Sequence, residues 1–433
     1  MSGPLQVWGG VECTVNRVGD RWTDQLRLSG HDDRIEDLDR IAALGIRTLR
    51  YPILWERTEV EPGVFDWTWA DARMARMERL GIRPIVGLVH HGAGPAWTSL
   101  VDDEGFAQGL ARFAAAVAAR YPHVWDWTPV NEPLTTARFS ALYGHWHPHA
   151  KDEGAFWRAL LNQIDATRLS MQAIRRIIPN ARLIQTEDFG VTYGTEPCAA
   201  QVRHENLHRL ATWDLLEERV VGTHGLYARI AGFGLATRLE AIAAAPSPAD
   251  VIGLNHYATS DRFLDHRLER YPPDRHGGNG VIRYADLEAV RVHDDPESFG
   301  WGRLFDRLRA RYGAPLAVTE CHLGCSVDQQ IRWLSDCWDA AEAARGRGVP
   351  VEAVTVWALL GSFDWDSLLT RNEGHYEPGA FDVSGGSPGP TDLARAVSAL
   401  TDEGRLTGAV DPPHVMAQQG WWRAADRFDP APA

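Results

Sequence analysis

The sequence is nearly devoid of lysine and has no long apolar run. Lys151 is the one lysine among 433 residues, so arginine carries almost all of the positive charge. The net charge of −14 argues against nucleic acids and anionic membrane surfaces as partners, because both require a basic patch. No apolar stretch approaches the ~18 residues of a membrane-spanning helix, and the N-terminus lacks the basic and apolar regions of a signal peptide. We therefore expect no nucleic-acid partner and no membrane partner.

Cysteine is also scarce, and its five copies form no recognisable pattern. An odd number of cysteines in a large chain without a signal peptide is typical of reduced thiols. Cys321 and Cys325 have no second pair nearby, so they predict neither a disulfide nor a metal site. The expected location is the cytoplasm.

Metal and nucleotide motifs are missing too. The Gly-Gly pairs at 9–10, 277–278 and 385–386 do not form phosphate-binding loops. His145, His147 and His149 alternate around Trp146, and alternating histidines can chelate zinc. A packed loop near the entrance of a binding site is the favoured interpretation. We expect no metal and no cofactor.

The chain otherwise has the composition of a globular protein that is rich in tryptophan. Hydrophobic residues make up 44% and charged residues 24%, which allows a large core. The 18 tryptophans either fill that core or offer flat platforms for the apolar faces of sugars.

Short β-prone runs alternate with amphipathic helical stretches along the chain. The expected strands are 6–11, 48–51, 84–89, 124–130, 182–186, 251–255, 316–319 and 353–357. The expected helices are 32–44, 68–80, 104–120, 154–178, 201–220, 296–312, 328–347 and 391–401. This alternation predicts a single (β/α)8 TIM barrel over residues 1–408. Segment 271–280 is expected to be a long loop. Residues 409–433 are expected to form a tail that packs on the barrel or frays.

Functional groups of such barrels stand at the C-terminal ends of the strands. Polar and aromatic residues gather at these predicted ends: Glu12, Arg50, His90, His91, Asn131, Glu132, Glu187, Asp188, Asn255, His256, Tyr257, Glu320, Trp357, Asp364 and Trp365. Together they predict an acidic pocket with aromatic walls.

Glu132 and Glu320 end the fourth and seventh predicted strands, which face each other across the barrel mouth. Cleavage of a glycosidic bond needs such a pair, one carboxyl protonated to release the leaving oxygen and one ionised to attack or to activate water. Repulsion between two close carboxylates raises one pKa and separates the roles. The alternative is that each glutamate simply pairs with an arginine, which is less common for two such residues than for one.

At these positions the sequence resembles glycoside hydrolase family 1, retaining β-glycosidases of the clan of (β/α)8 barrels with catalytic glutamates on strands 4 and 7. The segments that carry the resemblance run in the family's order: LGIRTLRYPILWER, GLVHHGAGPAW, TPVNEP, IGLNHYATS, AVTECHLG and WALLGSFDW. N-E-P alone recurs throughout the clan, whereas six segments in order are specific.

The resemblance implies a role for each matching residue. Glu132 would be the general acid/base, and Glu320 the nucleophile that forms a glycosyl-enzyme intermediate. Asn131 would bind the 2-hydroxyl of the sugar, while Arg50 and Tyr257 would flank the nucleophile. The implied partner is a small-molecule glycoside or oligosaccharide. The residues expected to line the sugar subsite are His90, Trp357, Asp364 and Trp365. No pattern in the sequence specifies an oligomeric state.

Several positions depart from the family's usual pattern. Glu12 stands where the family has glutamine, and Asp364 where it has glutamate. Cys321-His322 replaces Asn-Gly after the nucleophile, and Cys321 is expected to point away from the site because neighbours alternate along a strand. Glu187 is a further carboxylate and is expected to contact substrate. The sugar subsite is therefore expected to differ from the usual glucose subsite.

The resulting prediction is a retaining β-glycosidase that hydrolyses a small β-glycoside through a covalent intermediate. A transglycosylase of the same family would differ only in the access of an acceptor sugar. A clan relative with another sugar specificity is a further alternative. A barrel that binds a glycoside without turning it over belongs to a different class, and the presence of both glutamates with Asn131, Arg50 and Tyr257 argues against it.

Overall fold

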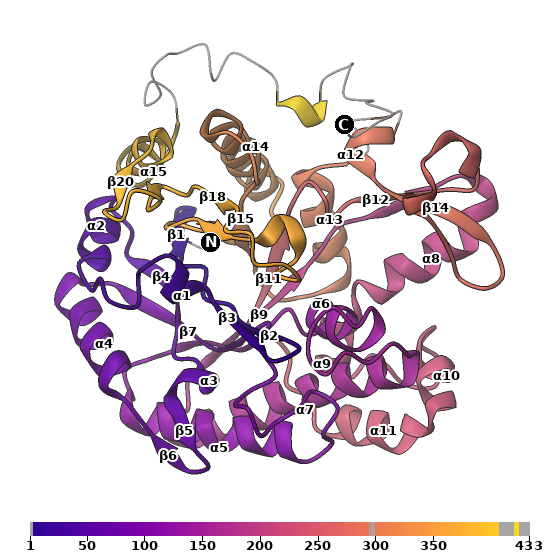
Figure 1. Cartoon of the computed structure of the whole chain (residues 1–433), viewed down its shortest axis with the longest axis horizontal. Helices are drawn as coiled ribbons and strands as arrows, with labels where there is room; N and C mark the ends of the chain where they lie inside the picture. The colour runs from indigo at the N-terminus through magenta and orange to yellow at the C-terminus, as the bar shows by residue number, and fades with distance from the viewer. Residues whose placement is uncertain (1–2, 294, 296–298, 407–419, 424–433) are drawn as a thin grey trace.

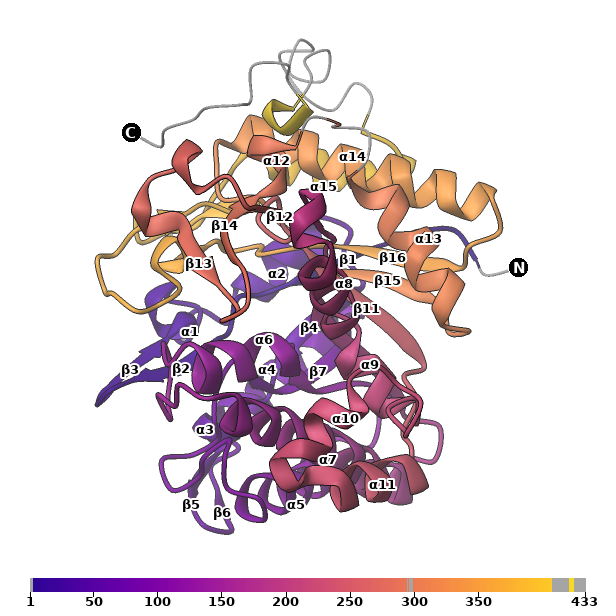
Figure 2. The same ribbon diagram turned by 90° about the vertical axis from the view of Figure 1, so that its right-hand side faces the viewer.

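A closed barrel of eight parallel strands forms the centre of the protein (Figures 1 and 2). The computed structural model describes residues 3–293, 295, 299–406 and 420–423. The strand order around the barrel is β1-β16-β15-β11-β9-β8-β7-β4. The bounds are β1 (Gln6–Gly10), β4 (Thr48–Pro52), β7 (Arg83–His90), β8 (Asp126–Asn131), β9 (Arg182–Asp188), β11 (Val251–His256), β15 (Leu316–Cys321) and β16 (Val351–Val356). The TIM barrel is confirmed, and each of its strands overlaps a predicted one.

The barrel is filled by a small apolar layer of its own. Six buried side chains from six different strands form this cluster: Trp8, Ile85, Ile184, Val251, Ala317 and Ala353. Residues between these inward positions point outward and join the larger core under the helices. Because both faces of each strand are buried, the strands read as nearly continuous apolar runs.

Helices surround the barrel as an outer ring (Figure 1). The longer ones are α2 (Asp37–Ala43), α4 (Thr68–Leu80), α5 (Gly105–Arg120), α7 (Glu153–Ile177), α8 (Ala199–His208), α9 (Ala211–Leu216), α11 (Ala236–Ala244), α13 (Trp301–Arg311), α14 (Val327–Gly346) and α15 (Asp392–Glu403). The shorter ones are α1 (Gln25–Leu28), α3 (Trp55–Thr58), α6 (Pro133–Ala137), α10 (Tyr227–Ile230) and α12 (Ala289–Val292). None of the described helices is long and apolar enough to cross a membrane.

Three predicted helices differ from those observed. The helix expected over 32–44 is the shorter α2, which begins only at Asp37. The single helix expected over 201–220 is two helices, α8 and α9, separated at Arg209 and Leu210. The helix expected over 296–312 begins at Trp301, directly after Gly300 with its φ of 116°, a conformation that helical residues do not adopt. Residues 296–298 lie outside the described part of the chain.

Small sheets and single helical turns lie in the connections between the barrel strands and the helices. The hairpin β2 (Val15–Val18) and β3 (Arg21–Asp24) follows β1, and a four-stranded sheet has the order β10-β12-β14-β13. Its bounds are β10 (Thr192–Gly194), β12 (Arg262–Asp265), β14 (Arg283–Glu288) and β13 (His276–Gly278). The remaining two-stranded sheets are β5 (Glu59–Glu61) with β6 (Val64–Phe65), β17 (Ser362–Phe363) with β18 (Tyr376–Glu377), and β19 (Phe381–Asp382) with β20 (Gly389–Pro390).

The segment expected to be a loop at 271–280 contains strand β13, so that prediction is wrong in part. His276 pairs with Ala285, and Gly277 with Tyr284, across an antiparallel edge. A three-residue edge strand with two glycines carries no apolar alternation, so the sequence offers no strand signal there.

Part of the C-terminal segment packs on the barrel. The 3-10 turn η8 (Trp421–Arg423) lies on α14, where Trp422 is buried and its ring meets Trp333 edge-on at 4.9 Å between centroids. The Trp422 indole and the Arg423 guanidinium both donate to Asp336. The rest of the predicted tail lies outside the described residues, and the domain boundary at 408 stays a prediction.

Candidate active site

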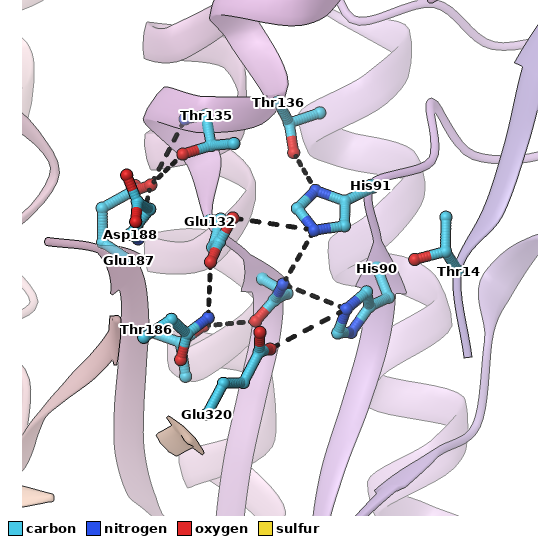
Figure 3. Close-up of polar contacts among 12 residues, drawn as sticks. Thr14, His90, His91, Glu132, Thr135, Thr136, Thr186, Glu187, Asp188 and Glu320 are labelled. Carbon is cyan, nitrogen blue, oxygen red and sulfur yellow. Dashed lines mark hydrogen bonds and ion pairs between the residues drawn. The ribbon is translucent and has the colours of Figure 1, made fainter. Parts of the chain in front are cut away.

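Glu132 stands in the turn between β8 and α6. Its backbone is left-handed, with φ 46° and ψ 63°, a conformation that costs a non-glycine residue roughly 1–2 kcal/mol. Pro133 then begins α6 at the position where a missing N–H matters least. The buried Glu132 carboxyl accepts a hydrogen bond from Asn255 Nδ2 at 2.6 Å, and His91 Nε2 lies 3.6 Å from its other oxygen (Figure 3).

Glu320 is held by a cation and a phenol near the end of β15. Arg50 Nη1 donates to one carboxylate oxygen at 2.8 Å, and the Tyr257 hydroxyl donates to the other. A register shift between β11 and β15 places Asn255 opposite Glu320. Both oxygens of Glu320 thus have donors, which is how a protein orients an ionised carboxylate.

Asn131 connects the surroundings of the two glutamates. Its Oδ1 accepts from Arg50 Nη2 and from Thr186 Oγ1, both at 2.7 Å. Its Nδ2 lies 3.2 Å from His90 Nε2 and 3.4 Å from His91 Nε2. The amide is therefore held from β4, β7 and β9 at once, and its orientation is fixed by its neighbours.

The two carboxyl groups differ in their electrostatic environment. Burial, and after it the negative charge of Glu320, raises the pKa of Glu132 well above its ordinary value, and Asn255 opposes this only in part. Burial also raises the pKa of Glu320, but Arg50 and Tyr257 both oppose that rise. Glu132 is thus the group that keeps its proton, and Glu320 is the group that ionises more readily.

Two neutral histidines form one wall of the site. Burial lowers the pKa of His90 well below its ordinary value and that of His91 to about 3. His90 stacks on Trp357 with 5.4 Å between ring centroids, and His91 meets Trp365 edge-on at 5.4 Å. Near neutral pH this wall adds no positive charge, so Arg50 is the cation that faces Glu320.

Glu12 enters the site at the end of the first strand. Burial raises the pKa of Glu12 to about 7, the charge of Glu320 adds to the rise, and contacts with Thr14 and Trp357 oppose it. The position of Trp357 depends on Gly10, because a Cβ there would lie 2.3 Å from an atom of the indole ring. Glu12 and Trp357 therefore lie next to each other at the end of the first strand.

Asp364 and Trp365 lie on the connection that follows β16. Asp364 is buried with φ 57°, and its Oδ1 accepts from the backbone N–H groups of Glu373 and His375 at 3.1 and 2.8 Å. Its Oδ2 and the Trp365 indole nitrogen are buried without a partner among the described residues. These two polar atoms are available to a ligand.

Glu187 does not face the pocket, which corrects the expectation that it contacts substrate. Its carboxylate is fully buried against α6, accepting from the backbone N–H groups of Leu134 and Thr135 and from the hydroxyls of Thr135 and Thr212. Every oxygen is occupied, so Glu187 caps the helix that follows Glu132. The charges of Asp188 and Glu187 both raise the pKa of Glu132, and the charge of Asp188 also raises that of Glu320.

The cysteine and histidine residues that could have indicated a thiol or metal site contact other parts of the protein. Cys321 lies against Cys337 of α14, pointing away from the site as expected. The three alternating histidines go to different partners, with His147 beside Arg17, His149 on Gly19 and Gly144, and His145 against Phe139. Among the described residues, no group of three or more histidine, cysteine, aspartate or glutamate side chains is arranged to hold a metal ion.

Similarity to known proteins shows the family of the chain. A family model described as glycosyl hydrolase family 1 matches residues 29–375. The chain belongs to glycosyl hydrolase family 1. It is therefore an O-glycosyl hydrolase by family.

The similar proteins of this family are distant in sequence. A 6-phospho-β-glucosidase from Dickeya chrysanthemi is 24% identical over 82% of this chain and 81% of that protein. β-Glucosidase A from Thermotoga maritima is 20% identical over 86% of both. A solved structure of a family 1 β-glucosidase from T. maritima covers 93% of this chain and 98% of its own, with a TM-score of 0.72 and 18% identity. Another, in complex with deoxynojirimycin, has a TM-score of 0.74.

Sequence reasoning about this family 1 member missed two residues that contact Glu132. Asn255 was predicted to lie at a strand end, but no role was assigned to it. In the structure it donates to Glu132, and its Oδ1 accepts from Thr319. His91 was likewise only one of the predicted strand-end residues, and it lies between Thr136, Asn131 and Glu132. The signal for Asn255 is its place directly before His256 and Tyr257 at the end of β11.

Proposed function

We propose that the protein is a retaining β-glycosidase that acts on a small β-glycoside by double displacement. The observation that supports this most is the unequal environment of Glu132 and Glu320 within one buried site. Glu132 has a raised pKa and one direct amide donor, as a general acid requires. Glu320 has Arg50 and Tyr257 on its two oxygens, as an oriented nucleophile requires.

The reaction would run in two steps. Glu132 protonates the glycosidic oxygen while Glu320 attacks the anomeric carbon and forms a glycosyl ester. Once the leaving group has departed, Glu132 takes a proton from water, and that water releases the sugar with its original configuration. Asn131, positioned by Arg50 and Thr186, would bind the 2-hydroxyl.

The sugar is expected to be neutral. Glu12 and Asp364 bring carboxyl groups to the subsite, and an ionised carboxylate repels a phosphate. The relatives include a β-glucosidase and a 6-phospho-β-glucosidase, so both a neutral and a phosphorylated sugar are candidates. The acidic subsite favours the unphosphorylated sugar. Glucosides are the first candidates, with galactosides, fucosides and mannosides next.

The test is release of nitrophenol from a panel of aryl β-glycosides. Glu320→Ala should lower kcat/KM by a factor on the order of 10³ or more. Azide should restore turnover and give the α-glycosyl azide, because it attacks from the face that Glu320 vacates. Glu132→Ala should give the β-glycosyl azide instead. Glu342→Ala, an exposed glutamate on α14, is the matched control and should match the wild type.

Two results would contradict the proposal. Full activity in Glu320→Ala would remove that residue from the covalent step. Binding of glycosides without turnover by the wild type would support a non-catalytic binding barrel. An added acceptor alcohol that diverts most of the product into a new glycoside would instead favour transglycosylation.

A further inference from the structure

Two arginines in the connections after β8 and β9 have hydrogen-bond donors without a partner among the described residues. Arg138 begins the π-helical turn η1 (Arg138–Leu142), which continues α6 after Glu132. Its side chain is 14% exposed and makes no hydrogen bond with any described residue. Its one ion pair, with Glu205 of α8, is 3.9 Å long, beyond hydrogen-bond distance.

Arg209 is the second arginine, and it follows α8 directly. Its side chain is 5% exposed. Nε donates to Thr192 Oγ1 at 3.3 Å, while Nη1 lies 3.7 Å from Asp188 and has no hydrogen-bond partner in the described chain. Arg138 and Arg209 each interact electrostatically with Asp188 and Glu205, and Arg209 also with Arg138, so the four charges form one cluster.

Two other arginines, the buried Arg50 and the partly buried Arg311, show what a satisfied guanidinium looks like. Arg50 bonds to Glu320, Asn131 and a backbone carbonyl at 2.6 to 2.8 Å. Arg311 makes two bonds of 2.6 Å with Asp214. A buried guanidinium without such acceptors is unfavourable. The contrast indicates that Arg138 and Arg209 are arranged for acceptors that a ligand supplies.

The position of the cluster identifies which part of a substrate it would meet. The general acid lies beside the leaving group, and roughly 9 Å of helix rise separates Glu132 from Arg138. Asp188, whose charge acts on Glu132 and on both arginines, lies between the two groups. Its other oxygen accepts from Ser260, so Asp188 already has a donor of its own.

We propose that Arg138 and Arg209 bind an oxyanion, a carboxylate or a phosphate group, on the aglycone of the glycoside. This inference rests on the proposed function, because it takes Glu132 as the acid that faces the aglycone. Guanidinium groups bind carboxylate and phosphate through paired N–H donors, and two such groups with unpartnered donors in one cluster suit an anion. Glu205 would compete with the ligand for Arg138.

The test compares leaving groups of similar size on the sugar that the aryl glycoside panel selects. The substrates are the 4-carboxyphenyl, 4-phosphonophenyl and 4-carbamoylphenyl β-glycosides. We expect the wild type to prefer an anionic substrate over the neutral amide by roughly tenfold in kcat/KM, as charge-assisted hydrogen bonds predict. The carboxylate and phosphonate arms show which oxyanion is preferred.

Four variants separate charge from structure. Arg138→Gln should reduce the preference to near unity, and Arg138→Lys should retain part of it. Glu205→Gln should increase it, because the competing carboxylate is gone. Arg120→Gln is the matched control on the outside of α5, where Arg120 pairs with Asp71, and it should keep the wild-type ratio.

A wild-type ratio of one or less, or a ratio that survives Arg138→Gln, would overturn the inference. Failure of the proposed function is distinguishable, because then none of the three substrates is hydrolysed, the neutral amide included. In that case calorimetric titration of the wild type and Arg138→Gln with 4-hydroxybenzoate and 4-hydroxybenzamide decides the matter. Equal binding of both compounds by the wild type would refute the arginine site.

Discussion

Glu12 illustrates how burial can make a carboxyl group resemble an amide. With its pKa raised to about 7, Glu12 is largely protonated below neutral pH and then carries one donor and one acceptor. Glutamine, the residue expected there in most of the family, offers the same pair of functions. The departure in the sequence is therefore smaller at mildly acidic pH than the change of residue type suggests.

The raised pKa of Glu12 predicts a pH-dependent stability difference. A carboxyl whose pKa is about 7 when folded and 4.5 otherwise favours folding below pH 4.5, and that contribution is lost as the pH rises through 7. Glu12→Gln has no such loss. Its free energy of unfolding relative to the wild type should grow by about 3 kcal/mol between pH 5 and 8 and then level off. Chemical denaturation at several pH values measures this.

The control for that experiment is Glu342→Gln on the exposed face of α14, which should show no pH trend. A difference for Glu12→Gln that is constant from pH 5 to 8 would mean that Glu12 titrates normally and is charged at pH 7.

Alternation along a strand explains which individual residues could be predicted. The sequence identified Glu132, Glu320, Asn131, Arg50 and Tyr257 as strand-end residues, and the structure brings all five into direct or shared contact. Glu187 was misplaced because strand ends present neighbours to opposite sides, and no rule in the sequence says which of Glu187 and Asp188 points inward. The capping contacts of Glu187 belong to tertiary structure.

At the scale of elements, α6 connects three functions within a few residues. It begins after Glu132, it is capped by Glu187, and it continues into the turn that carries Arg138. A five-residue helix has little stability of its own, so its position depends on such contacts. The carboxylate of Glu187 therefore contributes to where the acid/base stands.

Removal of that cap predicts a loss of both stability and turnover. Glu187→Ala leaves two backbone N–H groups and the Thr212 hydroxyl without their acceptor and should cost about 2–4 kcal/mol. We expect kcat to fall more than KM changes, because Glu132 loses its support. Glu187→Gln keeps one acceptor oxygen, so its stability and its kcat should lie between those of the wild type and Glu187→Ala. Thermal unfolding and steady-state kinetics provide the measurement.

A rise in KM with an unchanged melting temperature would show instead that Glu187 contacts substrate. That outcome would reinstate the original expectation and contradict the capping role.

Element prediction succeeded where periodic patterns were strong. The eight barrel strands were found because burial on both faces leaves apolar runs, and α4 was found with its observed ends because Gly81 stops it in the left-handed conformation. The edge strand β13 and the division between α8 and α9 were missed. The strand β13 depends on its pairing with β14, and the break between the two helices depends on tertiary packing. Short polar segments carry no periodic pattern that would predict either one.

For the whole molecule, the order of strands and helices specified the barrel, and the barrel specified where the site would be. What the pattern could not supply is how the connections after β8, β9, β11 and β16 fold over the mouth. Those connections decide the neighbours of Glu132 and the direction of Asp364. Substrate choice depends on them more than on the barrel.

Substitutions in the C-terminal turn η8 test whether residues beyond the predicted boundary at 408 stabilise the folded protein. Trp422→Ala should lower the stability by about 3 kcal/mol, because the ring is buried against Trp333. Trp421→Ala is the matched control, since Trp421 is half-buried and lies over Arg291 at 5.1 Å, and it should cost about 1 kcal/mol. Thermal unfolding at a fixed scan rate gives the comparison, and neither change should alter kcat on an aryl glycoside.

The stability of a chain that ends at residue 408 measures what the whole C-terminal segment contributes. If it loses no more stability than Trp422→Ala, the packing of the C-terminal segment resides in that one indole and its bond to Asp336. A larger loss would assign further contacts to the segment and make it part of the domain. Unchanged stability in both variants would mean that the turn does not hold to α14 in solution and that the barrel is complete at 408.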